Sequence, residues 1–262
     1  MTCRGVKGFR CGAGSGMSGG QGMIDTTTNG GCTVLRINRP DKANALTGAM
    51  LADLCAAVRA SDAPVLILTG EGRVFSAGAD LDGMKAGLGT SPEWESLSGA
   101  IAAYPGLTIA ALNGTLAGGA MGMALACDLR IAVPTATFFY PVMRLGYLPQ
   151  PSDPGRLAAL VGPSRARMIL LAGQRIGTDE ALAWGLVNRI APKGEALKLA
   201  QALAAQMATG PAQAIYACKR ALEFAVDLPE AEAIRRTLDL SEALSQTADF
   251  TEGVQAFIGK RP

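Results

Sequence analysis

Two short glycine turns place the tightest constraint on how this chain can fold. They are Phe75-Ser-Ala-Gly-Ala-Asp-Leu81 and Asn113-Gly-Thr-Leu-Ala-Gly-Gly-Ala-Met-Gly-Met-Ala-Leu-Ala-Cys-Asp128. Each follows an apolar run that predicts a strand, at 64–69 and 108–112. Because glycine tolerates backbone angles that a Cβ opposes, the two turns can aim free N–H groups at one point. Two convergent donors of this kind stabilise charge that develops on a carbonyl oxygen.

The second turn is the more specific of the two. Gly118 and Gly119 open a predicted helix, so the Gly119 N–H is a first-turn donor without a helical acceptor, at the positive end of the helix dipole. A dinucleotide loop is the alternative, but the glycines at 114, 118, 119 and 122 do not follow G-x-G-x-x-G. In the first turn, the Ala79 N–H is expected to lack a strand partner, and Asp80 to cap or brace the loop.

Composition narrows the chemistry further. The 262 residues include no histidine, which removes Ser-His-Asp and Cys-His catalysis and histidine-ligated metals. The six cysteines, at 3, 11, 32, 55, 127 and 218, lack C-x-x-C spacing, so we expect no metal site and a cytoplasmic protein with buried thiols. A net charge of +2 without a basic stripe argues against nucleic acid, and no run is apolar and long enough for a membrane.

The order of predicted elements indicates an α/β fold. Strands are expected at 32–37, 65–69, 108–112, 128–132 and 137–139, with intervening helices at 48–60, which Thr47 can cap, and 119–126. After Pro149 only helices are predicted, at 154–161, 163–172, 179–185, 193–209, 211–225, 229–248 and 251–258. We expect a flexible glycine-rich extension (1–24), an α/β core (25–200) and a helical oligomerisation region (201–262).

Together these segments resemble the crotonase (enoyl-CoA hydratase/isomerase) superfamily over about residues 32–262. Three further segments carry the likeness: Asn38-Arg-Pro-Asp-Lys-Ala-Asn-Ala-Leu46, Leu171-Ala-Gly-Gln-Arg-Ile-Gly-Thr-Asp-Glu-Ala-Leu-Ala-Trp-Gly-Leu-Val-Asn188 and Phe250-Thr-Glu-Gly-Val-Gln-Ala-Phe-Ile-Gly-Lys-Arg-Pro262. The resemblance implies a spiral of ββα turns with a C-terminal helical trimerisation region, hence a homotrimer or a dimer of trimers. It also implies an acyl-CoA ligand, with coenzyme A as part of the thioester substrate and no separate cofactor.

The same resemblance assigns residues to the site. The N–H groups of Ala79 and Gly119 would form the oxyanion hole. The path of coenzyme A and substrate would involve Lys42, Ala43, Ala45, Ala77, Gly78, Asp80, Leu81, Leu116, Gly118, Gly122, Pro141, Val142, Leu145, Phe257 and Lys260. Of these, Phe257 and Lys260 fall where the family often contacts the coenzyme A of a neighbouring subunit.

The chain departs from the family where proton transfer is expected. Hydratases of the family use two glutamates, and Gly122 and Val142 stand at those positions here. Other members of the family have a catalytic aspartate just after the position of Pro149, and here that residue is Gln150. Because a positioned acid or base contributes about 10²–10⁴-fold, we do not expect ordinary hydration or carboxylate-dependent isomerisation.

Several residues could replace the missing groups. Asp153 is the nearest carboxylate and could act as a base, but an aspartate before proline also suits a helix N-cap, which is the preferred interpretation. Tyr140 and Tyr147 could donate a hydrogen bond to the acyl group, although core packing is the simpler explanation.

Other side chains near this region have two interpretations each. Glu93 and Glu95 either border the acyl pocket or begin a solvated helix, and Trp94 is expected as a pocket wall. Arg144 either meets a carboxylated acyl group or lies on the surface. The sequence therefore leaves two functions open: an enzyme that stabilises the enolate of an acyl-CoA, and a non-catalytic acyl-CoA-binding protein.

Overall fold

The computed structural model describes residues 22–207 and 210–259. The strands are β1 (Ile24–Asn29), β2 (Cys32–Ile37), β3 (Val65–Gly70), β4 (Val74–Ser76), β5 (Leu107–Leu112), β6 (Thr115–Ala117), β7 (Leu129–Ala132), β8 (Thr137–Phe139), β9 (Ile176–Gly177) and β10 (Arg189–Ile190). They form a six-stranded sheet with the order β1-β2-β3-β5-β7-β10 and a four-stranded sheet with the order β4-β6-β8-β9. Among the described residues, we find no helix with the length and apolar character needed to span a membrane.

From β3 to β8, consecutive strands alternate between the two sheets. β3, β5 and β7 pair in parallel in the larger sheet, and the strands that follow each of them, β4, β6 and β8, pair in parallel in the smaller one. In this register Val65 lies beside Leu107, and Ile109 lies beside Leu129. Each ββ step therefore adds one strand to both sheets, which makes the spiral of ββα turns that the resemblance implies.

Helices cover these sheets. They are, with the 3₁₀ turns, η1 (Pro40–Lys42), α1 (Gly48–Ala60), α2 (Leu81–Lys85), η2 (Leu88–Thr90), α3 (Glu93–Ala102), η3 (Gly118–Ala120), α4 (Met121–Ala126), α5 (Val142–Leu145), α6 (Asp153–Val161), α7 (Pro163–Leu170), α8 (Thr178–Trp184), α9 (Ala196–Met207), α10 (Ala212–Asp227), α11 (Glu230–Ser245) and α12 (Ala248–Ile258). Thr47 caps α1 as predicted, because its side chain accepts the Met50 N–H at 3.3 Å. α9 packs on the six-stranded sheet through Ala196, Ala200 and Ala204, which recur every four residues along one helical face.

Both predicted domain boundaries fall inside regular elements of the structure. The extension was placed at 1–24, yet β1 already begins at Ile24, and residues 1–21 lie outside the described part of the chain. The sequence did not predict β1, because residues 26–29 of this strand are exposed and polar. The boundary at 200/201 falls inside α9, whose buried face belongs to the core, so the helical region begins after it.

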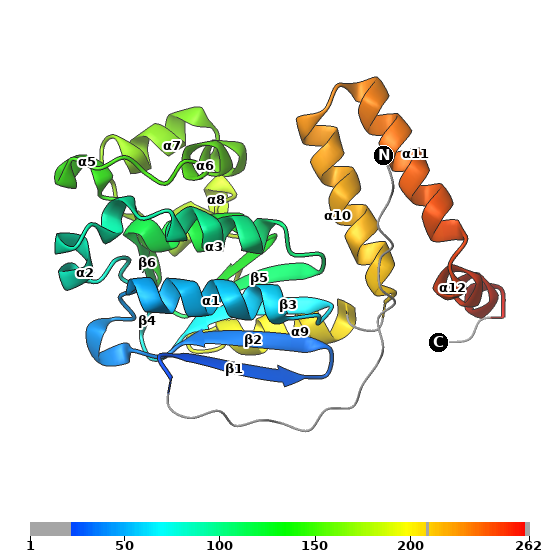
Figure 1. Cartoon of the computed structure of the whole chain (residues 1–262), viewed down its shortest axis with the longest axis horizontal. Coiled ribbons are helices and arrows are strands. Elements are labelled where there is room, and N and C mark those ends of the chain that lie inside the picture. Colours follow the sequence, from blue (N-terminus) through cyan, green and yellow to red (C-terminus); the bar gives the residue numbers. More distant parts are fainter. Residues whose placement is uncertain (1–21, 208–209, 260–262) are drawn as a thin grey trace.

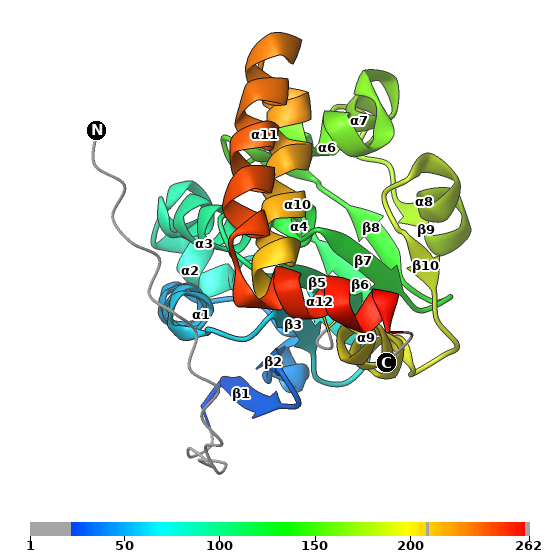
Figure 2. The ribbon, with the colours of Figure 1, turned by 90° about the vertical axis from the view of Figure 1, so that its right-hand side faces the viewer.

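The C-terminal helices α10, α11 and α12 extend away from the body (Figures 1 and 2). α10 packs against α11, and one cation of α10 ties the pair to the sheet. Lys219 Nζ donates to Asp128 Oδ2 at 3.0 Å and to the Tyr104 carbonyl at 3.0 Å. Asp128 immediately precedes β7, and the same Asp128 oxygen accepts the N–H and the hydroxyl of Thr108 in β5, both at 2.8 Å. Asp128 therefore joins two strands to the C-terminal helices.

We expect the change Lys219→Met to destabilise the fold by about 1.5–3 kcal/mol, because it removes a charged donor from a partly buried carboxylate. The measurement is the free energy of unfolding in urea. Lys198→Met is the matched control, since Lys198 pairs with Glu195 at 3.5 Å while its side chain is 78% exposed. That exposed pair should contribute less than about 1 kcal/mol. Equal losses in the two variants would contradict the role given to Lys219.

Candidate functional site

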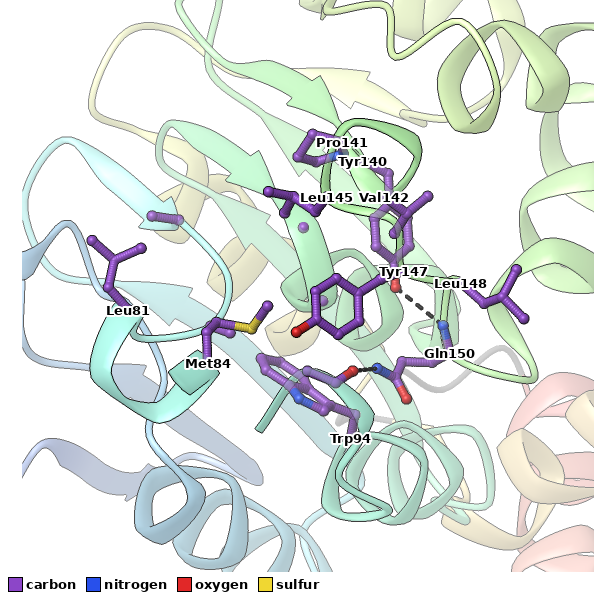
Figure 3. Close-up of a pocket in the computed structure, with 15 residues that line it drawn as sticks. Leu81, Met84, Trp94, Tyr140, Pro141, Val142, Leu145, Tyr147, Leu148 and Gln150 are labelled. Carbon is purple, nitrogen blue, oxygen red and sulfur yellow. Dashed lines mark hydrogen bonds between the residues drawn. The ribbon is translucent and has the colours of Figure 1, made fainter. Parts of the chain in front are cut away.

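An apolar cavity of about 270 Å³ lies where the two glycine turns meet. Ala77 and Ala79 of the first turn and Gly118 and Gly119 of the second form one side of it. The remaining walls come from α2, η2, α3 and the segment 140–150 (Figure 3). None of the described residues that line this cavity carries a charged side chain.

The two turns touch through glycine. Gly78 has a φ of +95°, and a Cβ there would lie 2.8 Å from the Ala117 carbonyl oxygen and 3.4 Å from the Gly118 Cα. A side chain at position 78 would therefore collide with backbone and push the turns apart. Parallel neighbours end at the same edge of a sheet, so the turns after β4 and β6 necessarily emerge together.

Two backbone donors in this contact remain unused. Leu46 donates to the Gly78 carbonyl at 2.8 Å and accepts from the Asp80 N–H at 2.9 Å, which fixes the turn on both sides of Ala79. Within the described residues, neither the Ala79 N–H nor the Gly119 N–H has a protein acceptor. Both residues line the cavity. This arrangement can hold one carbonyl oxygen between two N–H groups.

Asp80 braces the first turn as predicted. Its Oδ2 accepts from Arg39 Nη1 at 2.7 Å, and its Oδ1 caps α2 by accepting the N–H groups of Asp82 and Gly83. The hydrogen bond from Arg39 is the main reason that the pKa of Asp80 lies below its ordinary value. The carboxylate is thus fully engaged in holding the loop.

Trp94 forms a wall of the cavity, which confirms the prediction. A Cβ at Gly119 would lie 3.2 Å from the indole ring, so glycine permits this close packing. The indole Nε1 donates to the Leu88 carbonyl at 2.8 Å. Its neighbours Glu93 and Glu95 do not line the cavity, because Ser91 and Ser152 respectively donate to their carboxylates at the start of α3.

The segment 140–150 supplies the opposite wall. Tyr140, Pro141, Val142, Leu145, Tyr147, Leu148 and Gln150 all line the cavity. Figure 3 shows the Tyr147 ring between this segment and the side chains of Met84 and Trp94. Arg144 is exposed and absent from the lining, which leaves it on the surface.

The prediction that Asp153 caps its helix is wrong. Asp153 is the first residue of α6, Ser152 occupies the N-cap position, and no side chain caps this helix. Instead, the fully buried Asp153 Oδ2 accepts the Tyr140 hydroxyl at 2.8 Å, and that hydroxyl accepts the Gln150 N–H at 3.2 Å. Burial raises the pKa of Asp153 to about 6, against the lowering effects of Tyr140 and Arg156.

Gly122 makes room for this carboxylate. A Cβ on Gly122 would lie 2.8 Å from Asp153 Oδ1, an oxygen that has no hydrogen-bond partner among the described residues. The carboxylate from α6 therefore occupies the space that a side chain from α4 would take. Sequence reasoning missed this pairing because 122 and 153 lie on different helices, and the only local signal was a glycine inside an apolar helical run.

Of the remaining predicted binding residues, those that the structure describes do not line the cavity. Ala43 and Ala45 belong to a loop that adjoins the first turn, since Ala77 N donates to the Ala43 carbonyl at 3.0 Å, and Lys42 is exposed in the same loop. Leu116 is buried in β6. Phe257 is 86% exposed on α12, and Lys260 lies outside the described residues. The part of the chain that the structure describes holds no grouping of three His, Cys, Asp or Glu side chains suited to a metal ion.

The chain belongs to the enoyl-CoA hydratase/isomerase family, whose sequence model matches residues 27–262. A protein of Rhodobacter capsulatus named "Probable enoyl-CoA hydratase" is 37% identical over 239 residues, which span 88% of this chain and 93% of that protein. The 2,3-dehydroadipyl-CoA hydratase of Escherichia coli is 34% identical over 239 residues, with 87% of this chain and 92% of that protein covered.

Solved structures share the fold. The crystal structure of an enoyl-CoA hydratase from Bacillus anthracis matches with a TM-score of 0.85 and 28% sequence identity, and the match covers 92% of this chain and 97% of that one. The two glycine turns and the spiral thus belong to the crotonase fold.

We expect Gly122→Ala to destabilise the protein by about 1–3 kcal/mol, because the new methyl group would press on the Asp153 carboxylate. In an Asp153→Ala background the methyl group meets no oxygen, so the same change should cost less. The free energies of unfolding of the two single variants and the double variant form a cycle, with an expected coupling of about 0.5–3 kcal/mol. Additive losses would show that the two side chains do not compete for one space.

Proposed function

We propose that the chain binds an acyl-CoA thioester in this cavity and stabilises its enolate with the N–H groups of Ala79 and Gly119. The observation that supports it is the pair of unused donors on one uncharged cavity. An enolate oxygen carries charge that a thioester carbonyl lacks, so fixed donors in an apolar site favour the enolate. We do not propose ordinary hydration, because Gly122 and Val142 have no side-chain group that can transfer a proton.

The surrounding loops support one position for the proposed ligand. We propose that coenzyme A runs past Ala77 and the loop of Lys42, Ala43 and Ala45, which adjoins the first turn. The acyl group would enter the apolar end formed by Val142 and its neighbours. Because no charged side chain among the described residues lines that end, an uncharged acyl group fits best. Coenzyme A enters as part of the substrate, and no metal or separate cofactor is proposed.

A second candidate function is binding without chemistry. One observation favours it: no carboxylate of the described residues lines the cavity, so no ionised base would touch the bound acyl group directly. The two candidates predict the same affinity for an acyl-CoA and differ only in whether a product forms.

We expect calorimetric titration to show binding of butyryl-CoA and crotonyl-CoA, with crotonyl-CoA hydration at least about 10²-fold slower than by a two-glutamate hydratase assayed in parallel. Mass spectrometry of the recovered ester detects any product. Leu145→Trp should weaken binding at least about tenfold by filling the cavity, whereas Leu171→Trp should not. The two leucines are equally exposed, at 60% and 59%, but only Leu145 lines the cavity. Rapid hydration, or no binding at all, would contradict the proposal.

We also propose that the C-terminal helices assemble the chain into a homotrimer or a dimer of trimers. These helices expose a series of large apolar side chains, which are Tyr216, Leu222, Val226, Ile234, Leu238, Phe250, Val254, Phe257 and Ile258. Exposed apolar surface on this scale is typical of a contact between subunits.

We expect native mass spectrometry to find a particle of three or six chains. Leu238→Asp should shift the population toward single chains, because it would bury a charge in the proposed contact. Leu171→Asp, at a leucine of similar exposure outside the C-terminal helices, should leave the assembly intact. A monomeric wild-type protein would contradict this assembly.

A further inference from the structure

Tyr140 stands between the cavity and a buried carboxylate. It is 2% exposed, lines the cavity, and donates its hydroxyl to Asp153 Oδ2 at 2.8 Å. Figure 3 shows the Tyr140 ring beside Val142, with its hydroxyl directed toward the backbone N–H of Gln150. Asp153 does not itself line the cavity, and among the described residues that do, Tyr140 is the one that a hydrogen bond joins to its carboxylate.

We infer that Tyr140 is the catalytic residue that moves a proton at the α-carbon of the bound thioester, with Asp153 behind it as the positioning residue that takes up the hydroxyl proton of Tyr140. This inference rests on the proposed function, since it needs an acyl-CoA in the cavity. The carboxylate that the site lacks at position 122 is thereby supplied from α6, one side chain further from the substrate.

The proposed step balances without another reactant. The α-carbon loses its proton to the Tyr140 oxygen while the Tyr140 hydrogen passes to Asp153 Oδ2. The C–H electron pair becomes the enolate, and its negative charge lies on the thioester oxygen between the two N–H donors. The tyrosine hydroxyl accepts one N–H bond and keeps a second lone pair for this transfer. Tyr140 gains one proton as it passes another to Asp153, so it stays neutral. Deuterium enters the ester when the protons held by Tyr140 and Asp153 exchange with D₂O before the reverse step returns one to the carbon.

The environment of Asp153 suits a proton store. Its Oδ1 is buried without a partner, and Nη1 of Arg156, on the same helix, is likewise buried without one in the described chain. A buried carboxylate with full hydrogen bonding would stay ionised, whereas one of the two oxygens of Asp153 has no donor among the described residues. The charged groups that act on it are Arg156, which lowers its pKa, and Glu95 of α3, which raises it.

The pH dependence has a definite sign. Removal of the α-proton needs the ionised carboxylate as the final acceptor, and the pKa of Asp153 is raised to about 6. The exchange rate should therefore rise as the pH increases through this value and then level off. The pKa of Tyr140 is raised far above its ordinary value, chiefly by burial, so the hydroxyl keeps a proton throughout this range.

The test is exchange of the α-protons of butyryl-CoA in D₂O, followed by mass spectrometry, with calorimetric binding of the same ester to each protein. We expect the wild-type protein to incorporate deuterium. Tyr140→Phe and Asp153→Asn should each lose at least about 10²-fold in rate while binding the ester, and Asp153→Asn should also lose the rise with pH. The Asp153→Asn side chain keeps an oxygen that can accept the tyrosine hydroxyl, so a purely structural role would survive this change.

Tyr104→Phe is the matched control. Tyr104 is 3% exposed, and its hydroxyl donates to the Ala63 carbonyl away from the cavity. This variant should exchange at the wild-type rate. Wild-type binding without exchange, or exchange that persists in Asp153→Asn with its pH dependence intact, overturns the inference and leaves the proposed binding in place. Absence of wild-type binding overturns both.

Discussion

The first glycine turn rests directly on the second, and the rest of the site depends on this contact. Gly78 approaches the Ala117 carbonyl so closely that a Cβ would lie 2.8 Å from it. The approach is possible because β4 and β6 are parallel neighbours, which deliver their turns to one edge of the smaller sheet. Two backbone hydrogen bonds with Leu46, one to the Gly78 carbonyl and one from the Asp80 N–H, fix the first turn. The N–H groups of Ala79 and Gly119, which both line the cavity, are left without a protein acceptor among the described residues.

The apolar walls of the cavity affect how strongly these two N–H donors can act. Trp94 packs on Gly119 from one side, and the segment 140–150 closes the other. In a site of this kind an N–H dipole acts through a low dielectric, so it stabilises developing charge more strongly than it would in water. The same lack of polar surroundings shifts the pKa of Asp153 toward neutrality. Both the proposed oxygen binding and the proposed proton storage would depend on this apolar environment.

The C-terminal helices depend on the same body for their orientation. Asp128 accepts hydrogen bonds from Thr108 of β5 and from Lys219 of α10, so the start of β7 and the base of the helical pair are joined through one carboxylate. The apolar side chains further along these helices are exposed in the single chain. A rigid attachment at the base and an apolar surface beyond it are suited to contact with further copies, as proposed above.

The sequence by itself determined the family, the turns and most of the regular elements, because these depend on local patterns. The run at β3 is continuous and apolar, α1 has a cap and a 3.6-residue period, and the glycine turns have few alternatives. The sequence did not predict edge strand β1, because most of its residues are exposed and polar. It also did not predict that α9 belongs to the core, because that depends on what the helix packs against.

Tertiary structure alone decided the role of Asp153. The dipeptide Asp153-Pro154 fits a helix cap, and nothing nearby in sequence indicates otherwise. In the folded chain, α4 presents a glycine where α6 presents the carboxylate, and Tyr140 reaches it from the end of β8. A buried acid takes its partners from whatever elements meet it in space. Local sequence could therefore identify the two glycine turns but not the carboxylate that the Tyr140 hydroxyl contacts.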